Sequence, residues 1–184
     1  MTHASPLDGI EPDIVARAAR VRLACFDVDG VMTDGGLYYS DAGHEAKRFH
    51  VLDGLGLKLL LASGIEVAVI TARDTPAVNR RMRDLGIRHV FAGVPDKRAC
   101  MLALAQQLRL DSAQVAHVGD DLPDLGLMSA VGFAVTVAGV HPRIAAVAHW
   151  QTGKRGGDGA VREVCELILA AHGLLDAAIE RFRT

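Results

Sequence analysis

Short runs of hydrophobic residues alternate along this chain with segments in which apolar residues recur at helical spacing. Buried strands are predicted in the apolar, often β-branched runs at 21–28, 65–72, 88–93, 113–120 and 132–137. Helices are predicted in the periodic segments at 13–20, 54–64, 76–86, 96–110, 122–130 and 160–172. Strands that alternate with helices of this length predict βαβ units. We therefore expect an α/β fold: a Rossmann-like, doubly wound, mostly parallel sheet with helices on both faces.

One insertion interrupts the alternation of strands and helices. Residues 36–51, "GLYYSDAGHEAKRFHV", predict two strands around a turn at 40–43, where Asp and Gly favour a tight reversal. A length of 184 residues fits one domain with a real core. We expect an N-terminal extension with a short helix at 1–20, the main domain at 21–173 and a C-terminal tail at 174–184.

Composition removes several classes of partner. The net charge of -2 and the aromatic content of 4% give no reason to expect a nucleic-acid partner. The longest apolar runs are too short to span a membrane, so we expect no transmembrane segment and no membrane partner. The three cysteines lie far apart without paired spacing, which favours a reducing, cytoplasmic setting over disulfides or a metal cluster.

Polar residues capable of chemistry gather where predicted strands end. They are Asp27 and Asp29 after the first strand, Thr71 and Arg73 after the second, Lys97 at a helix start, and Asp120, Asp121 and Asp124 in "GDDLPD". In parallel sheets, ligands bind outside the carboxyl ends of the strands. Each residue alone fits a helix cap or turn, but their common position predicts a single site.

The chemistry of these side chains indicates phosphoryl transfer. Carboxylates without Cys or His companions suit a hard cation such as Mg²⁺. Thr71 and Lys97 are suited to hold phosphoryl oxygens. A carboxylate beside a phosphate is a credible nucleophile, because an aspartyl-phosphate intermediate divides one difficult displacement into two easier ones. Alternation along a strand would direct Asp27 and Asp29 to the same face.

Four motifs in order resemble those of the haloacid dehalogenase superfamily of phosphotransferases: "DVDG" at 27–30, "ITA" with Thr71, Lys97, and "GDDLPD" at 119–124. The resemblance implies that Asp27 is the nucleophile and Asp29 the general acid and base. It implies that Asp27, the Asp29 carbonyl and Asp120 hold Mg²⁺, and that Thr71 and Lys97 hold the phosphoryl group. Asp121 is implied to orient either the metal site or Lys97.

A narrower resemblance covers nearly the whole chain and concerns the capless phosphatases of 3-deoxy-D-manno-octulosonate 8-phosphate. It is carried by "FHVLDGLGLK", "GDDLPD", "HP" at 141–142 and "GGDGAVREVCELIL". It implies hydrolysis of an eight-carbon sugar acid phosphate in lipopolysaccharide precursor synthesis, by a homotetramer in which neighbouring subunits help to close each site. Substrate contacts are implied at Asp29, His50, Val51, Leu52, Asp53, Gly54, Lys58, Arg73, Arg81 and Lys97.

Two positions depart from that narrower pattern. Leu52 and Asp158 stand where the family often has Arg, so both remove positive charge near the expected sugar acid. Lys154 or Arg155 in the same glycine-rich loop would compensate if either reaches the site.

Three alternatives remain beside the leading interpretation. One is a phosphatase of a nine-carbon, sialic-acid-type 9-phosphate. A signalling receiver domain is disfavoured, because here the candidate nucleophile lies on the first strand and the chain is too long. A non-catalytic oligomeric interaction module fits the hairpin and the tail, but it would be favoured by loss of Asp27, Asp29 or Lys97, and all three are present.

Overall fold

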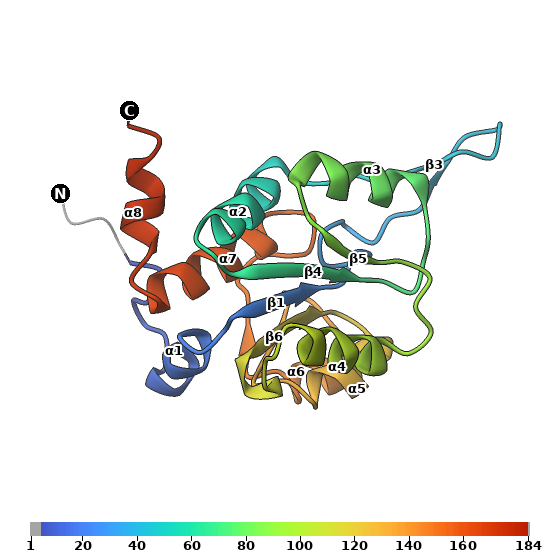
Figure 1. Ribbon diagram of the computed structural model, residues 1–184. Coiled ribbons are helices and arrows are strands. Elements are labelled where there is room, and N and C mark those ends of the chain that lie inside the picture. The colour runs from blue at the N-terminus through green and yellow to red at the C-terminus, as the bar shows by residue number, and fades with distance from the viewer. Residues whose placement is uncertain (1–4, 184) are drawn as a thin grey trace.

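The computed structural model describes residues 5–183 and contains one six-stranded sheet between two layers of helices (Figure 1). The strand order is β5-β4-β1-β6-β7-β8, and every neighbouring pair is parallel. The strands are β1 (Leu23–Phe26), β4 (Glu66–Ile70), β5 (His89–Phe91), β6 (Val115–Gly119), β7 (Phe133–Thr136) and β8 (Trp150–Gln151). The predicted α/β fold is confirmed.

Helices cover both faces of the sheet (Figure 1). One layer contains α2 (Val51–Ala62), α3 (Pro76–Leu85) and α7 (Ala160–Ala171). The other contains α4 (Lys97–Gln107), α5 (Leu125–Met128) and α6 (Pro142–Ala145), with 3₁₀ turns η1 (Ser112–Gln114) and η2 (Leu122–Asp124) beside them. Each layer closes a separate hydrophobic core against the sheet. The doubly wound arrangement follows, because parallel strands need a crossover that covers one face or the other.

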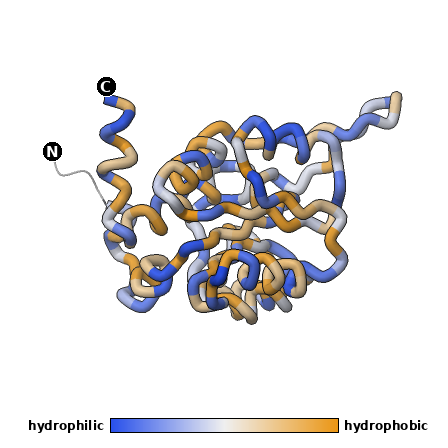
Figure 2. Tube along the Cα trace, viewed as in Figure 1, coloured by the Kyte–Doolittle hydropathy of each residue, from blue (hydrophilic) through white to orange (hydrophobic). Residues whose placement is uncertain are grey.

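The central strands are apolar along their whole length, as expected for strands buried on both faces. All four residues of β1 are fully buried, and Figure 2 shows the middle of the sheet as largely hydrophobic. In the register, Phe26 lies beside Val69 of β4 and Val118 of β6. The ends of these three strands therefore lie next to one another. None of the helices described is long and apolar enough to cross a membrane.

The two ends of the chain contribute short helices. α1 (Pro12–Ala18) was expected, whereas α8 (Leu175–Glu180) lies in a segment expected to be a tail. α8 begins after α7 ends near Gly173, and it buries Leu175 and Ala178 against the rest of the protein. Six residues give too little periodicity to predict such a helix without its tertiary contacts. Residues 1–4 of the expected N-terminal extension lie outside the described residues.

The insertion after β1 forms the expected hairpin, which extends away from the sheet (Figure 1). Its paired strands, β2 (Tyr38–Tyr39) and β3 (Glu45–Ala46), are shorter than predicted. α2 in turn begins at Val51, earlier than the predicted residue 54. The reason is a cap: the His50 imidazole accepts a hydrogen bond from the backbone N–H of Leu52, 3.3 Å away, and so starts the helix sooner.

Candidate active site

The carboxyl ends of β1, β4 and β6 surround a pocket of about 180 Å³. It is lined by Asp27, Asp29, Thr71, Ala72, Arg73, Lys97, Asp120, Asp121, Pro123 and Asp124. The fold thus brings together all the residues for which sequence analysis expected catalytic, phosphate-binding, metal-binding or supporting roles. Of the additional substrate contacts implied by resemblance, Arg73 is the one found in this pocket.

Asp27 and Asp29 line the same pocket, but a turn of the backbone, and not a strand, directs the two side chains there. β1 ends at Phe26, so strand alternation does not direct both side chains. The Asp27 N–H still donates to Val118 O at 3.0 Å, and the chain then turns, with Met32 N–H donating to Val28 O at 2.9 Å. The predicted strand at 21–28 is thus shorter in the structure, and alternation along a strand does not account for the common direction of the two acids, because this turn follows directly after Asp27.

Lys97 links the nucleophile candidate to a second acid. Its Nζ lies 2.8 Å from Asp27 Oδ2 and 2.8 Å from Asp124 Oδ1. All three residues are buried, so these ion pairs are shielded from water. Of the two roles implied for Asp121, the contact with Lys97 belongs to Asp124, which accepts from the ammonium, while Asp121 lies exposed at the rim of the pocket. Its other implied role, orienting the metal site, stays a prediction.

Sequence analysis gave no role to His117, and none to Asp124 beyond its place in "GDDLPD". His117 lies in the middle of β6 with no exposed surface, and its Nε2 is 2.9 Å from Asp124 Oδ1. Because a carboxylate can only accept, Nε2 is the protonated nitrogen of the ring. A histidine inside an otherwise apolar strand was the available signal, since a buried polar side chain requires a partner.

Asp27, Asp120 and Asp124 form a cluster in which one carboxylate oxygen from each residue lies within 4.8 Å of the other two. Asp124 is already engaged, because Oδ1 meets Lys97 and His117 and Oδ2 accepts from Asp120 N–H at 3.2 Å. Although burial works against it, these partners lower the pKa of Asp124 to about 2. Asp27 and Asp120 are consequently the two acids of the cluster best placed to hold a cation.

The remaining two acids carry the electrostatic signature of a cation site. Burial raises the pKa of Asp120 to about 7, and repulsion from Asp27 and Asp124 adds to the effect. Burial and repulsion from Asp124 also raise the pKa of Asp27, against the influence of Lys97. Two oxygen-donor acids that resist ionisation together fit a hard divalent cation, whose charge would offset their repulsion.

We expect affinity for Mg²⁺ to fall as the pH drops below about 7. A proton on Asp120 must leave before its carboxylate can bind metal, so affinity should decrease roughly tenfold per pH unit below 7 and level off above it. Calorimetric titrations at about pH 6 and about pH 8 measure this difference. Asp120→Asn serves as the comparison, with weak binding and a flatter dependence. An affinity of the native chain that is unchanged between the two pH values would contradict the assignment.

Thr71 and Arg73 complete the pocket from the end of β4. Thr71 is buried, its N–H donates to Phe91 O at 2.9 Å, and its carbonyl accepts from Val94 N–H at 3.0 Å. These bonds hold its hydroxyl at the pocket wall. The Arg73 Nε lies 3.8 Å from Asp29 Oδ2.

The other implied substrate contacts lie around the first turns of α2 and do not line this pocket. Val51 is 80% exposed and Leu52 47% exposed, and Lys58 is also exposed. Arg81 donates to His50 O at 3.3 Å, and its guanidinium carbon lies 5.8 Å from the centre of the Phe49 ring. Gly54 accommodates this guanidinium, because a Cβ there would overlap Arg81 Nη2.

Asp53, also among the implied contacts, faces the protein interior. It is only 2% exposed, and its Oδ1 accepts from Arg162 N–H at 2.9 Å. It therefore satisfies a free backbone donor at the start of α7, where Gly159 provides no side-chain cap. In this chain its contacts are those of a structural link between α2 and α7.

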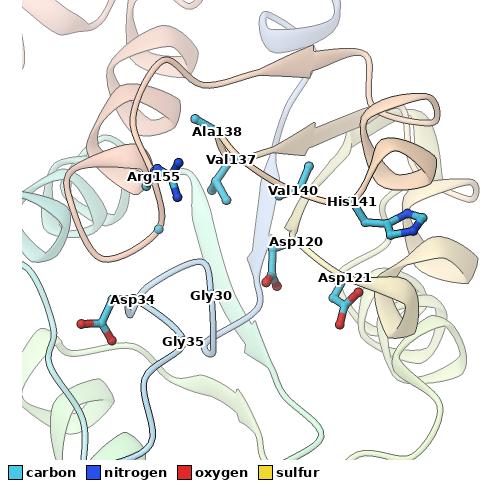
Figure 3. Close-up of a pocket in the computed structure, with 12 residues that line it drawn as sticks. Gly30, Asp34, Gly35, Asp120, Asp121, Val137, Ala138, Val140, His141 and Arg155 are labelled. Carbon is cyan, nitrogen blue, oxygen red and sulfur yellow. The ribbon is translucent and has the colours of Figure 1, made fainter.

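A second cavity of about 510 Å³ shares Asp120 and Asp121 with the first pocket (Figure 3). Arg155 lines it together with Asp34 and His141. Lys154 instead lines a separate cavity of about 240 Å³, which it shares with Leu52. Of the two compensating cations considered from sequence, Arg155 is thus the one beside the acidic cluster.

The glycine-rich loop that carries Arg155 packs directly on the turn after Asp27. Gly157 N–H donates to Val31 O at 3.1 Å. A Cβ on Gly156 would overlap the carbonyl of Gly30, so only glycine allows the two backbones to approach this closely. The position of the turn therefore depends on residues near the other end of the chain.

Comparison with known proteins agrees with this geometry. The family model for haloacid dehalogenase-like hydrolases matches residues 55–132. The chain is 44% identical, over 92% of its length and 90% of the relative's, to 3-deoxy-D-manno-octulosonate 8-phosphate phosphatase of Yersinia pestis. A hypothetical protein of Xanthomonas campestris is 53% identical, with a TM-score of 0.97 and full coverage of both chains.

A third similar structure contains both a metal ion and product-like ligands. It is the 3-deoxy-D-manno-octulosonate 8-phosphate phosphatase of Moraxella catarrhalis, in complex with a magnesium ion, a phosphate ion and a KDO molecule. It is 43% identical, with a TM-score of 0.90 and coverage of 92% of this chain and 98% of that one. Together with the buried acids at the carboxyl edge of the sheet, these similarities show that the chain belongs to the 3-deoxy-D-manno-octulosonate 8-phosphate phosphatase family of haloacid dehalogenase-like hydrolases.

Proposed function

We propose that this chain is a Mg²⁺-dependent phosphomonoesterase that hydrolyses 3-deoxy-D-manno-octulosonate 8-phosphate to the free sugar acid and phosphate, a step of lipopolysaccharide precursor synthesis. The observation that carries the proposal is the placement of the buried Asp27 and Lys97 and the half-buried Asp120 in one pocket. Its relatives bear the name of this activity, and the Moraxella structure holds magnesium, phosphate and a KDO molecule.

In the first half of the reaction, Asp27 is the nucleophile. One of its carboxylate oxygens attacks phosphorus, and the bond from phosphorus to the sugar oxygen breaks. Asp29 gives its proton to that leaving oxygen, because an alkoxide is a poor leaving group at neutral pH. Lys97, 2.8 Å from Asp27 Oδ2, orients the nucleophile, and together with the Thr71 hydroxyl it holds phosphoryl oxygens.

In the second half, the phosphoaspartate is hydrolysed. Asp29, now ionised, takes a proton from water, and the water oxygen attacks phosphorus. The bond between phosphorus and Asp27 breaks, so phosphate leaves and both carboxyl groups return to their starting states. Asp124 takes no direct part; with His117 it keeps Lys97 in position.

The acidic donor set fits magnesium, which would be held by Asp27, Asp120 and the backbone carbonyl of Asp29, with Asp121 beside the site. Bound there, Mg²⁺ supplies the positive charge that lets carboxylates and an anionic phosphate come together.

The sugar acid also needs cations for its carboxylate. We assign Arg73 to substrate binding in the same pocket, and Arg155 as a compensating charge in the adjoining cavity. His50, Val51, Leu52, Gly54, Lys58 and Arg81 are proposed to act on the site of a neighbouring subunit. The high exposure of Val51 and Leu52 supports such a contact, because apolar side chains are readily buried between subunits.

A homotetramer in the cytoplasm is part of this proposal. The exposed Leu37, Tyr38 and Tyr39 of the hairpin offer apolar surface for packing against other copies, and the three free cysteines suit a reducing compartment. Light scattering should give the mass of four 19.5-kDa chains. A monomer at assay concentration would contradict the assignment of these α2 and α3 residues, and of His50, to a neighbour's site.

A substrate panel tests the activity itself. Phosphate release is measured with and without Mg²⁺ on the eight-carbon sugar acid 8-phosphate, a nine-carbon sialic-acid-type 9-phosphate and neutral hexose phosphates. We expect kcat/KM to be highest for the eight-carbon substrate and to vanish with a chelator. Equal or higher kcat/KM on the nine-carbon substrate would favour the sialic-acid-type alternative. That alternative is included because Leu52 and Asp158 stand where the family often has Arg.

A further inference from the structure

Four charged side chains form a closed ring beside the catalytic pocket, and two of them, Asp29 and Arg73, line it. Lys47 Nζ contacts Asp29 Oδ1 and lies 3.0 Å from Glu45 Oε1. Glu45 Oε2 lies 2.6 Å from Arg73 Nη2, and Arg73 Nε lies 3.8 Å from Asp29 Oδ2. Positive and negative groups alternate around the ring. It joins three segments: the turn after β1, the hairpin and the end of β4.

Lys47 is the most buried member of this ring. Its side chain has no exposed surface, whereas those of Glu45, Asp29 and Arg73 are 14%, 23% and 38% exposed. A buried ammonium is costly unless charged partners surround it, and here two carboxylates do so. The Lys47 contact with Asp29 is therefore more than a surface ion pair of negligible strength.

The ring holds the Asp29 carboxyl group by one oxygen. Lys47 donates a hydrogen bond to Oδ1, whereas Arg73 lies 3.8 Å from Oδ2, beyond hydrogen-bond distance, so Oδ2 is the oxygen that can carry the transferred proton. Asp29 lies within the turn after β1 and outside any regular strand, so its backbone alone leaves the carboxylate free to rotate. Proton transfer requires a carboxyl oxygen within hydrogen-bond reach of the leaving oxygen, and a misplacement of about 1 Å can cost about 100-fold in rate.

We propose that Lys47 is a positioning residue of this enzyme: from the hairpin of the same chain, it fixes the Asp29 carboxylate for proton transfer, with Glu45 holding Lys47 and Arg73 in register. The inference rests on the proposed function, in which Asp29 is the general acid. The hairpin is then part of each active site in its own subunit, in addition to any role between subunits.

Leaving-group dependence separates this role from a purely structural one. A sugar alcohol must receive a proton as it leaves, whereas p-nitrophenolate leaves without one. The rate constant for alcohol or nitrophenol release is measured in single turnovers for Lys47→Met and Lys47→Arg. The substrates are the eight-carbon sugar acid phosphate and p-nitrophenyl phosphate. Mg²⁺ affinity and thermal melting are recorded for each variant.

For Lys47→Met we expect release of the sugar to slow by about 100-fold, with a change of less than about threefold for p-nitrophenyl phosphate. Lys47→Arg should recover most of the loss, because it restores the cation. Mg²⁺ affinity should stay unchanged. Equal losses on both substrates, or no loss on either, would overturn the proposal.

A matched control is Arg48→Met, which removes a cation from the same hairpin. Arg48 is exposed and pairs only loosely with Asp34, at 3.5 Å, so neither substrate should be affected by more than about twofold. Should Lys47→Met fail to fold, Glu45→Gln makes the same test by removing one of the two carboxylates that hold Lys47. It should slow sugar release selectively by roughly tenfold, and an equal effect on both substrates counts against the ring.

Failure of the proposed substrate would look different. If the native enzyme does not prefer the eight-carbon sugar acid phosphate, the proposed function fails. The ratio of alcohol to nitrophenol release can still be measured with any alkyl phosphate that the native enzyme hydrolyses. The role of Lys47 therefore stands or falls independently of the sugar.

Discussion

Replacing Asp27 with Asn is expected to abolish phosphate release, with kcat reduced by at least about 10⁴-fold. Asparagine keeps the size of the side chain but cannot form the phosphoaspartate. Lys97 keeps its contact with Asp124 at 2.8 Å, so the pocket should retain its shape. Steady-state phosphate release with saturating Mg²⁺ measures the effect on the purified variant.

The control for this substitution is Asp41→Asn, which makes the same chemical change at an exposed position of the hairpin. It should keep native activity. Circular dichroism and light scattering on Asp27→Asn should match the native protein. Retention of Mg²⁺-dependent phosphate release in Asp27→Asn would disprove the assignment of Asp27 as the nucleophile.

Gly30→Ala is expected to weaken metal binding although it replaces none of the acidic residues. A Cβ at position 30 would overlap Asp120 Oδ2, and the backbone there has a φ of +85°, which side chains rarely adopt. Asp120 must therefore move away from Asp27. We expect affinity for Mg²⁺ to fall by roughly 10- to 100-fold, as when a partner of a metal ligand is lost, and activity to fall with it.

Gly64→Ala separates the overlap from backbone strain. Gly64 has a φ of +80°, but a Cβ there meets no atom within 4 Å. Both variants should therefore lose about 1–2 kcal/mol of unfolding free energy from the left-handed backbone. Only Gly30→Ala should lose metal affinity in calorimetric titrations. A Gly30→Ala variant that binds Mg²⁺ as well as Gly64→Ala does would show that Asp120 can relax.

The sheet could be predicted because its strands are locally unambiguous. β1, β4 and β6 consist almost wholly of buried apolar residues, and parallel strands buried on both faces produce this pattern. Helices whose ends or existence depend on side-chain and tertiary contacts were harder to predict from the sequence. The early start of α2 depends on the His50 cap, and α8 is a six-residue helix that depends on packing.

The acids at the strand ends could be predicted for a similar reason: in a parallel sheet, position along the strand determines which edge a residue reaches. The contacts that other side chains make with these acids could not be predicted. His117 and Lys97 meet on Asp124 from different elements, and Lys47 reaches Asp29 from the hairpin. Such pairings depend on side-chain directions that one sequence does not specify.

The packing of Gly156 and Gly157 on the turn at Gly30 and Val31 has a consequence for biosynthesis. The nucleophile lies near the start of the chain, while the loop that supports its turn lies near the end. A chain emerging from the ribosome at roughly 5–20 residues per second can form β1 early, but it cannot complete the catalytic turn until about residue 157 has emerged. We therefore expect phosphatase activity only in chains from which the glycine-rich loop has already emerged.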